Sequence, residues 1–121
     1  MNRALVSALL AATLFCLSIT ARASDSTATG TVINLVVDST AGGSGAEIVS
    51  FQVTNMPNTG CPTGTWFFFD PTDVTDAQTR KNLLTTLFAA KLSGATVNVV
   101  YSSTVCDSAS GYAIPIALIM P

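Results

Sequence analysis

Acidic side chains are the first place to look for reaction chemistry in this 121-residue chain, because it contains no histidine. Histidine is the commonest general base and the commonest metal ligand in proteins. Asp70, Asp73 and Asp76 follow one another at intervals of three residues. An EF-hand calcium loop instead needs ligands at alternate positions, a central glycine and a closing glutamate. Turns and a helix cap therefore account better for the three aspartates, and the sequence predicts no metal site and no cofactor.

Other catalytic arrangements are also missing from the sequence. Glycoside hydrolysis uses two paired carboxylates, but the only glutamate is Glu47, beside a glycine-rich stretch. No GxSxG nucleophile elbow occurs among the many serines. The glycine-rich stretch at 42–45 does not match a phosphate loop, because no lysine and no predicted helix follow it. We therefore do not expect an enzyme.

The first 23 residues have the layout of a secretory signal peptide. A short basic start is followed by an apolar run of about sixteen residues and by a polar exit that ends in Ala21-Arg22-Ala23. The run is shorter than the roughly 20 residues that span a membrane. The sequence thus predicts cleavage after Ala23, a single domain over 24–121 and no membrane insertion of that domain. We expect a secreted or periplasmic protein.

Two cysteines remain after this cleavage. Cys16 lies in the apolar run and would be discarded, which leaves Cys61 and Cys106. A pair of cysteines in an exported domain is typical of a disulfide. We therefore predict a Cys61–Cys106 bridge, which also leaves no lone cysteine as a nucleophile.

The charge balance excludes two classes of partner. Residues 24–121 carry three basic and seven acidic side chains, a net charge of −4. Proteins that follow a phosphate backbone or an anionic membrane surface need the opposite balance. Neither nucleic acid nor an anionic membrane surface is therefore an expected partner.

The hydrophobic pattern predicts three strands, a helix and then two more strands. After a polar lead-in at 24–29, alternation places Thr31, Ile33, Leu35 and Val37 on one face of the first strand. Asp73 or Thr75 is the expected cap of the helix, and Gly94 the expected stop. Pro115 indicates an edge or a bulge in the last strand. The predicted strands cover 30–38, 46–55, 65–69, 95–102 and 112–120, and the helix covers 77–93.

This order of elements favours a mainly β fold, a small five-stranded OB-fold-like barrel with one helix between strands three and four. The run from Trp66 to Phe69 makes both faces of the third strand apolar. We expect the barrel interior to bury one face, and the helix or a neighbouring subunit to cover the other.

The helix pattern also bears on assembly. Its apolar residues fill an arc of about 200°, calculated at 100° per residue, whereas an ordinary surface helix needs little more than ~100°. Arg80, Lys81 and Lys91 fall within this arc, where their stems can lie on apolar surface. The excess predicts a homo-oligomer that associates through this helix and the outer side of the third strand. A generous core helix is the alternative.

From Thr29 to about Leu118 the sequence resembles the B-subunit-like OB-fold proteins of bacterial AB-type toxins, of the subtilase cytotoxin and typhoid toxin type. The matching stretches are TGTVI, SFQV, a helix that ends in LSG, and ATVNVVY. Members of this family form pentameric rings, bind sialylated or related glycans and carry a toxic A subunit. The resemblance therefore implies a pentamer with a glycan partner.

The resemblance also implies a sugar site. In the family a hydroxyl residue just before the glycine of the first strand contacts the sugar, and Thr29 before Gly30 has that position here. A tyrosine at the end of the fourth strand lines the same pocket, and Tyr101 matches it. The leading hypothesis is thus a non-enzymatic, ring-forming glycan-binding module. The alternatives are an envelope structural or assembly protein and a small inhibitor, either of which would bind a protein partner.

Overall fold

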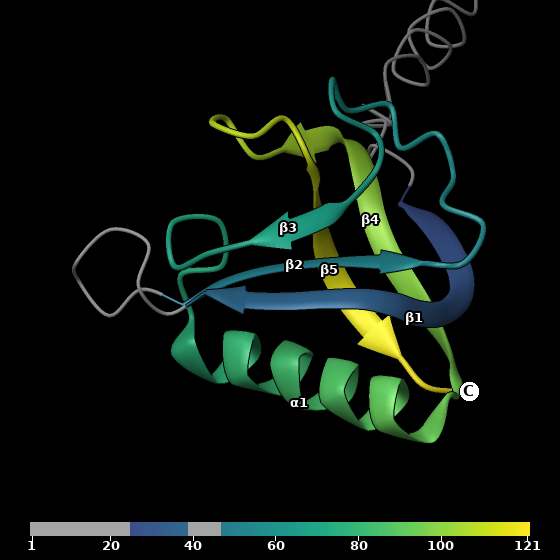
Figure 1. The fold of residues 1–121 in the computed structure, drawn as a ribbon. Coiled ribbons are helices and arrows are strands. Elements are labelled where there is room, and N and C mark those ends of the chain that lie inside the picture. Colours follow the sequence, from purple (N-terminus) through teal and green to yellow (C-terminus); the bar gives the residue numbers. More distant parts are fainter. Residues whose placement is uncertain (1–24, 39–46) are drawn as a thin grey trace, which may run out of the picture.

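The computed structural model describes residues 25–38 and 47–121. Five strands and one helix make up a mainly β fold, with the helix between the third and fourth strands, as the sequence predicts (Figure 1). The predicted signal peptide and the glycine-rich stretch lie outside the described residues. The strands are β1 (Ser26–Asp38), β2 (Ile48–Val53), β3 (Phe67–Phe69), β4 (Thr96–Cys106) and β5 (Ala113–Ile119), and the helix is α1 (Ala77–Ser93).

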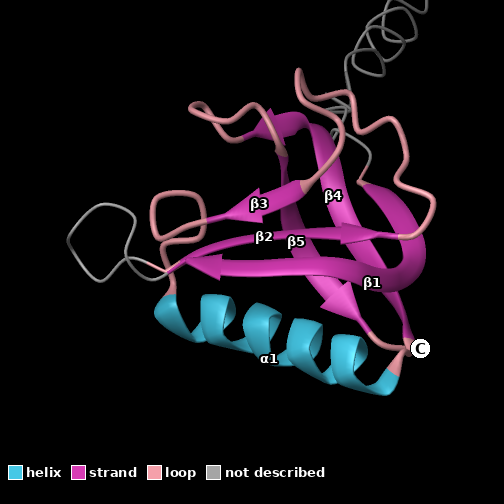
Figure 2. Cartoon of the chain, in the orientation of Figure 1, coloured by secondary structure: helices cyan, strands magenta, loops and turns pink. Residues whose placement is uncertain are grey.

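The strands form one mixed sheet in the order β1-β2-β3-β5-β4, and β4 pairs back onto β1, so that the sheet closes on itself. The pairings are antiparallel except between β3 and β5, where Phe67 pairs with Ala113 in parallel. Figure 2 shows β1, β2 and β3 crossing one side of the molecule, with α1 lying along one end of the sheet. In the part of the chain that the structure describes, no helix is long and apolar enough to span a membrane.

Strand β1 begins earlier than predicted and pairs with two different strands along its length. Its first part, Ser26–Thr31, pairs with β4, and its second part pairs with β2 from Val32 to Asp38. The predicted lead-in at 24–29 was therefore partly wrong, because a strand far along the chain supplies its hydrogen-bonding partner.

A register shift between Val32 and Asn34 interrupts β1 where it passes from one partner to the other. Val32 is buried, whereas Ile33 is 45% exposed. After the shift Leu35 is opposite the buried Phe51. The extra residue of a bulge reverses the alternation, so the prediction that Ile33 shares a face with Leu35 was wrong.

Gly30 allows β1 to approach closely the end of β2, next to the register shift. The Thr54 amide donates to the carbonyl of Thr31 at 2.9 Å, and the Thr31 amide donates to Thr54 Oγ1 at 3.0 Å. A Cβ atom on Gly30 would lie 2.4 Å from the Thr54 carbonyl oxygen, well inside contact distance. Only glycine fits there without movement of one of the two strands.

We predict that Gly30→Ala lowers the free energy of unfolding by about 1–3 kcal/mol or more, the usual cost of overpacking a tight site. Urea denaturation measures the change. Gly64→Ala is the matched control, because its Cβ would meet nothing closer than 3.8 Å. Equal stability of the two variants would contradict the close approach.

The core lies inside the closed sheet and is rich in aromatic rings. Phe51 and Phe67 stack with ring centroids 5.2 Å apart, and Phe69 is also fully buried. Helix α1 packs against β1 and β5 and adds Leu83, Leu87 and Ala90 to the buried set. Of the edge or bulge predicted at Pro115, the structure agrees with the second, because Pro115 is opposite Tyr101 at a register shift between β4 and β5.

The helix begins at a different cap from the one predicted. Asp76 Oδ2 accepts hydrogen bonds from the Thr79 amide at 2.8 Å and from the Thr79 hydroxyl at 2.6 Å. The predictions of Asp73 or Thr75 were wrong because residues 70–74 form a turn of their own, with the Val74 amide donating to the Asp70 carbonyl at 3.0 Å. The predicted stop is confirmed, since Gly94 has the left-handed conformation (φ 66°) at the helix end.

The predicted disulfide is present. Cys61, in the connection between β2 and β3, is bonded to Cys106 at the end of β4, with an S–S distance of 2.02 Å. The bridge joins residues 45 positions apart in the sequence. It thereby fastens a long loop to the sheet.

We expect the double variant Cys61→Ala/Cys106→Ala to lose ~4 kcal/mol of unfolding free energy in the chain-entropy description of a loop of this length. Chemical denaturation with and without reductant measures the loss. The reduced parent should approach the double variant, while reductant should leave the double variant unchanged. A double variant as stable as the oxidised parent would refute the prediction.

Candidate functional site

Tyr101, one of the two residues assigned to a sugar site by resemblance, lies inside the closed sheet. Its side chain is only 4% exposed, and its ring centroid is 5.4 Å from that of Phe67 at an angle of 57°. It pairs with Ser26 across β1 and β4. The ring therefore forms part of the core.

Thr29, the other residue, lies on the outside. It is exposed, and its hydroxyl donates to Asn98 Oδ1 at 2.9 Å. Opposite residues of an antiparallel pair share a face, so Thr29 faces outward with Asn98, whereas Tyr101 faces inward with Ser26. The structure does not bring Thr29 and Tyr101 together in one pocket.

The outer face of β1, β2 and β3 carries a chain of polar side chains. Asn34 Nδ2 donates to Gln52 Oε1 at 2.7 Å, and Gln52 Nε2 donates to the Thr65 carbonyl at 2.7 Å. Asn34 and Gln52 are paired across the strands and lie on the side away from Phe51 and Val53. Two uncharged amides are thus held in a fixed orientation at the surface.

Aromatic rings border this polar chain. Phe68 is opposite Ser50, which in turn is opposite Val36, so that these three side chains form a row across the outer face. The Phe68 ring lies 6.3 Å from that of Tyr112, which comes from the loop before β5. Both rings are partly buried, as is Trp66. We call the surface formed by Asn34, Gln52, Trp66, Phe68 and Tyr112 the outer aromatic face.

The outer aromatic face explains why the third strand is apolar on both sides. Phe67 and Phe69 fill the core, while Trp66 and Phe68 alternate with them. Phe68 has Tyr112 beside it, and α1 packs against β1 and β5 instead. The sequence pattern alone could not show that Asn34 faces outward, because this depends on the bulge in β1. It also could not show that Tyr112 lies near Phe68, because this depends on the parallel pairing of β3 with β5.

A second group of polar residues lies where the loops after β3 and β4 meet. Asp70, Asp73 and Asp107 each offer one carboxylate oxygen within 4.8 Å of the others. Asp107 is buried, and its Oδ2 accepts from the Ser110 hydroxyl at 2.6 Å and from the Ala109 amide at 3.2 Å. Carboxylate oxygens are the ligands of hard cations, so these are the residues of the described chain with the donor chemistry for one. The sequence placed Asp70 and Asp73 near each other but gave no sign of Asp107.

The pKa values of Asp70 and Asp73 are shifted in opposite directions. Burial, together with the nearby carboxylates of Asp70 and Asp107, raises the pKa of Asp73 to about 6. Its Oδ2 is buried and has no hydrogen-bond partner among the described residues. For Asp70, burial alone would raise the pKa, but hydrogen bonds from Thr72 and from the Asp73 amide outweigh it and lower the pKa. As the pH falls, Asp73 therefore takes up a proton before Asp70 does.

We predict that Asp73→Asn stabilises the protein at pH 7.5 but not at pH 4. Because the folded-state pKa of Asp73 is raised to about 6, its stabilising contribution is present below the unfolded pKa and is lost as the pH rises through 6. The neutral amide avoids this loss, which we expect to be on the order of 1 kcal/mol after solvent screening. Denaturation at a series of pH values measures it.

Asp76→Asn is the matched control, since asparagine caps a helix as well as aspartate does. Hydrogen bonds from Thr79 lower the pKa of Asp76, so this carboxylate stabilises at neutral pH and loses its contribution as the pH falls. The two variants should thus change the pH profile in opposite directions. Parallel profiles for Asp73→Asn and the parent would contradict the assignment.

Comparison with known proteins gives no relative: no protein-family model, no curated protein and no solved structure matches the chain. The resemblance to toxin B subunits therefore stays a prediction from the sequence.

Proposed function

We propose that this protein is a non-enzymatic carbohydrate-binding module of an oxidising compartment, secreted or periplasmic, and that it binds glycans on the outer aromatic face. The observation that carries the proposal is the placement of partly buried aromatic rings beside two oriented, uncharged amides on one side of the sheet. The Cys61–Cys106 bridge is compatible with such a compartment.

The sheet topology supports an OB-fold-like barrel. The closed order β1-β2-β3-β5-β4, with α1 between β3 and β4, agrees with a five-stranded Greek-key barrel of that type. OB-folds use the surface of their second and third strands for oligosaccharides or oligonucleotides. Here that surface is part of the outer aromatic face. The net charge of −4 over residues 24–121 favours the oligosaccharide, because a phosphate backbone needs basic partners.

The side chains suit a neutral polyhydroxylated ligand. A ring such as Phe68 provides an apolar platform for the C–H face of a sugar, and Tyr112 adds a hydroxyl at its edge. The amides of Asn34 and Gln52 both donate and accept hydrogen bonds. Their mutual hydrogen bond fixes them before a ligand arrives, which lowers the entropic cost of binding.

A single face of this kind binds weakly. Each protein–sugar hydrogen bond contributes only ~0.5–1.5 kcal/mol net. A ring of copies, as the resemblance implies, would raise avidity by roughly 10²–10⁴-fold without new contacts. The pentamer stays a prediction. Thr29 lies on the outside of β1 and is a second candidate for sugar contact, whereas Tyr101 supports the sheet from within.

We predict that the purified protein binds glycans on an array and that Phe68→Ala and Gln52→Ala each weaken this binding by about tenfold, the loss expected for one important contact. Ile116→Ala is the matched control, because it removes a 48% exposed apolar side chain on β5 that is not part of the outer aromatic face. Thermal melting of each variant separates lost binding from lost folding. Thr29→Ala in the same array compares this face with the site implied by resemblance.

The proposal would be overturned if the parent protein bound no glycan. It would equally fail if both Phe68→Ala and Gln52→Ala bound as well as the parent. Loss of binding in Thr29→Ala alone would transfer the site to the Thr29–Asn98 side of the sheet.

A further inference from the structure

Positive charge is concentrated on one element of this acidic protein. Arg80, Lys81 and Lys91 are all the basic residues of the described chain, and all three belong to α1. The acidic residues lie on strand ends and in loops, at Asp25, Asp38, Glu47, Asp70, Asp73, Asp76 and Asp107. Helix α1 therefore carries all the positive charge of the described residues, with Arg80 and Lys81 adjacent in its first turns.

The helix also has apolar side chains at the surface, in addition to those that it contributes to the core. Leu83, Leu87 and Ala90 are buried, but Phe88 is 46% exposed and Leu92 is 86% exposed. Isolated exposed apolar residues are ordinary on a protein surface. Here Phe88 and the partly buried Leu84 are one turn apart and lie beside the two basic residues of the first helical turns.

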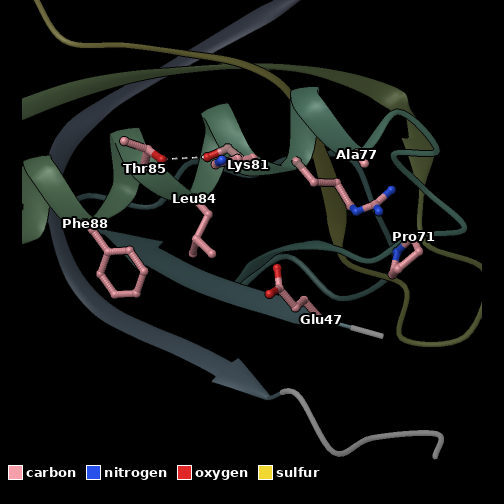
Figure 3. Close-up of a pocket in the computed structure, with 8 residues that line it drawn as sticks. Glu47, Pro71, Ala77, Lys81, Leu84, Thr85 and Phe88 are labelled. Carbon is pink, nitrogen blue, oxygen red and sulfur yellow. Dashed lines mark hydrogen bonds between the residues drawn. The ribbon is translucent and has the colours of Figure 1, made fainter. Parts of the chain in front are cut away.

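A groove of ≈ 500 Å³ runs along this face of α1. On one side it is lined by Ala77, Arg80, Lys81, Leu84, Thr85 and Phe88, and on the other by Glu47 and Pro71. Figure 3 shows the Leu84 and Phe88 side chains projecting from the helix toward the side on which Glu47 lies. The groove thus has an apolar strip from the helix and a carboxylate opposite that strip.

Both basic residues of the groove have unused hydrogen-bond donors. Arg80 Nη1 donates to the carbonyls of Val74 and Thr75 at 2.6 and 3.1 Å, which fixes the guanidinium at the start of the helix. An arginine has five N–H groups, and Nη2 and Nε make no hydrogen bond to the described residues. Lys81 is exposed and makes no side-chain hydrogen bond or ion pair with the described residues. By contrast, Lys91 Nζ donates to the Ile33 carbonyl at 2.7 Å and does not line the groove.

We propose that the α1 groove binds an extended segment of a partner protein in which an acidic side chain stands next to a large apolar one. The apolar side chain covers Leu84 and Phe88, and its acidic neighbour pairs with Lys81 and Arg80. The Glu47 carboxylate accepts hydrogen bonds from donors of the same segment. Charge complementarity selects this occupant, because a basic segment would meet two cations in the groove.

The shape and charge of the groove argue against two other occupants. A small-molecule site usually buries most of its ligand, whereas Phe88 stays nearly half exposed although it lines this groove. An anionic membrane surface attracts bases but repels Glu47, which lies opposite them. The groove and the outer aromatic face use different residues, so the two proposals stand or fall separately.

The test is a selection of short random peptides displayed on phage against the purified protein, followed by fluorescence titration of the synthetic peptides obtained. We expect the selected peptides to combine Asp or Glu with an adjacent Phe, Leu or Trp. Lys81→Glu and Phe88→Ser should each weaken their binding by about tenfold. Both residues are exposed, so neither change should prevent folding.

Matched controls come from the same helix. Lys91→Glu makes the same charge change as Lys81→Glu, and Leu92→Ser removes an even more exposed apolar side chain than Phe88→Ser. Neither residue lines the groove, so both control variants should bind the peptides nearly as tightly as the parent. Equal losses in the control and groove variants would overturn the proposal.

Three further outcomes would also overturn it. One is a selection that yields no acidic–apolar peptide. Another is binding to phosphatidylglycerol vesicles that Lys81→Glu and Lys91→Glu weaken equally, which would assign the helix to a membrane surface. The third is light scattering that shows an oligomer of the parent which Phe88→Ser dissociates, because the groove would then be occupied by a second copy of the chain.

Discussion

The structure depends on one strand that must serve two partners. Strand β1 pairs first with β4 and then with β2, and the sheet closes only because β1 turns between them. The turn needs the register shift beside Ile33 and the close approach of Gly30 to Thr54. A closed sheet leaves no unpaired edge strand, and its interior is narrow enough to be filled by side chains such as Phe51, Phe67 and Phe69. Closure and core are therefore consequences of the same local irregularity.

The bulge also determines which side chains reach the surface. Val32 points inward, so uninterrupted alternation would send Asn34 inward as well. The extra residue turns Asn34 outward, where it bonds to Gln52, and turns Leu35 inward opposite Phe51. One inserted residue thus places an amide on the outer aromatic face and keeps an unpaired polar group out of the core. The feature that closes the sheet and the feature that orients the proposed binding face are the same.

Local patterns in the sequence predicted the elements well, and non-local contacts explain most of what they missed. The helix, its stop at Gly94, the inward row of Val49, Phe51 and Val53, and the disulfide follow from periodicity, composition and cysteine number. The start of β1 depends on β4, about seventy residues away, and the bulge is defined only by the pairing of β1 with β2. Tyr101 was assigned by resemblance to a pocket, but its inward direction follows from the register with Ser26. Asp107 joins Asp70 and Asp73 only through the folding of two separate loops.

The loop after β4 is held in place by a covalent bond and by hydrogen bonds, although it brings a third carboxylate close to two others. The loop after β4 places Asp107 beside two other carboxylates and also presents Tyr112 to Phe68. The loop is attached to the β2–β3 connection by the disulfide and by the Thr63 amide, which donates to the Gly111 carbonyl at 2.9 Å. Within the loop the Asp107 amide donates to the Tyr112 carbonyl at 2.8 Å. The position of the Tyr112 ring beside Phe68 therefore rests on the bonds that fasten this loop to the β2–β3 connection.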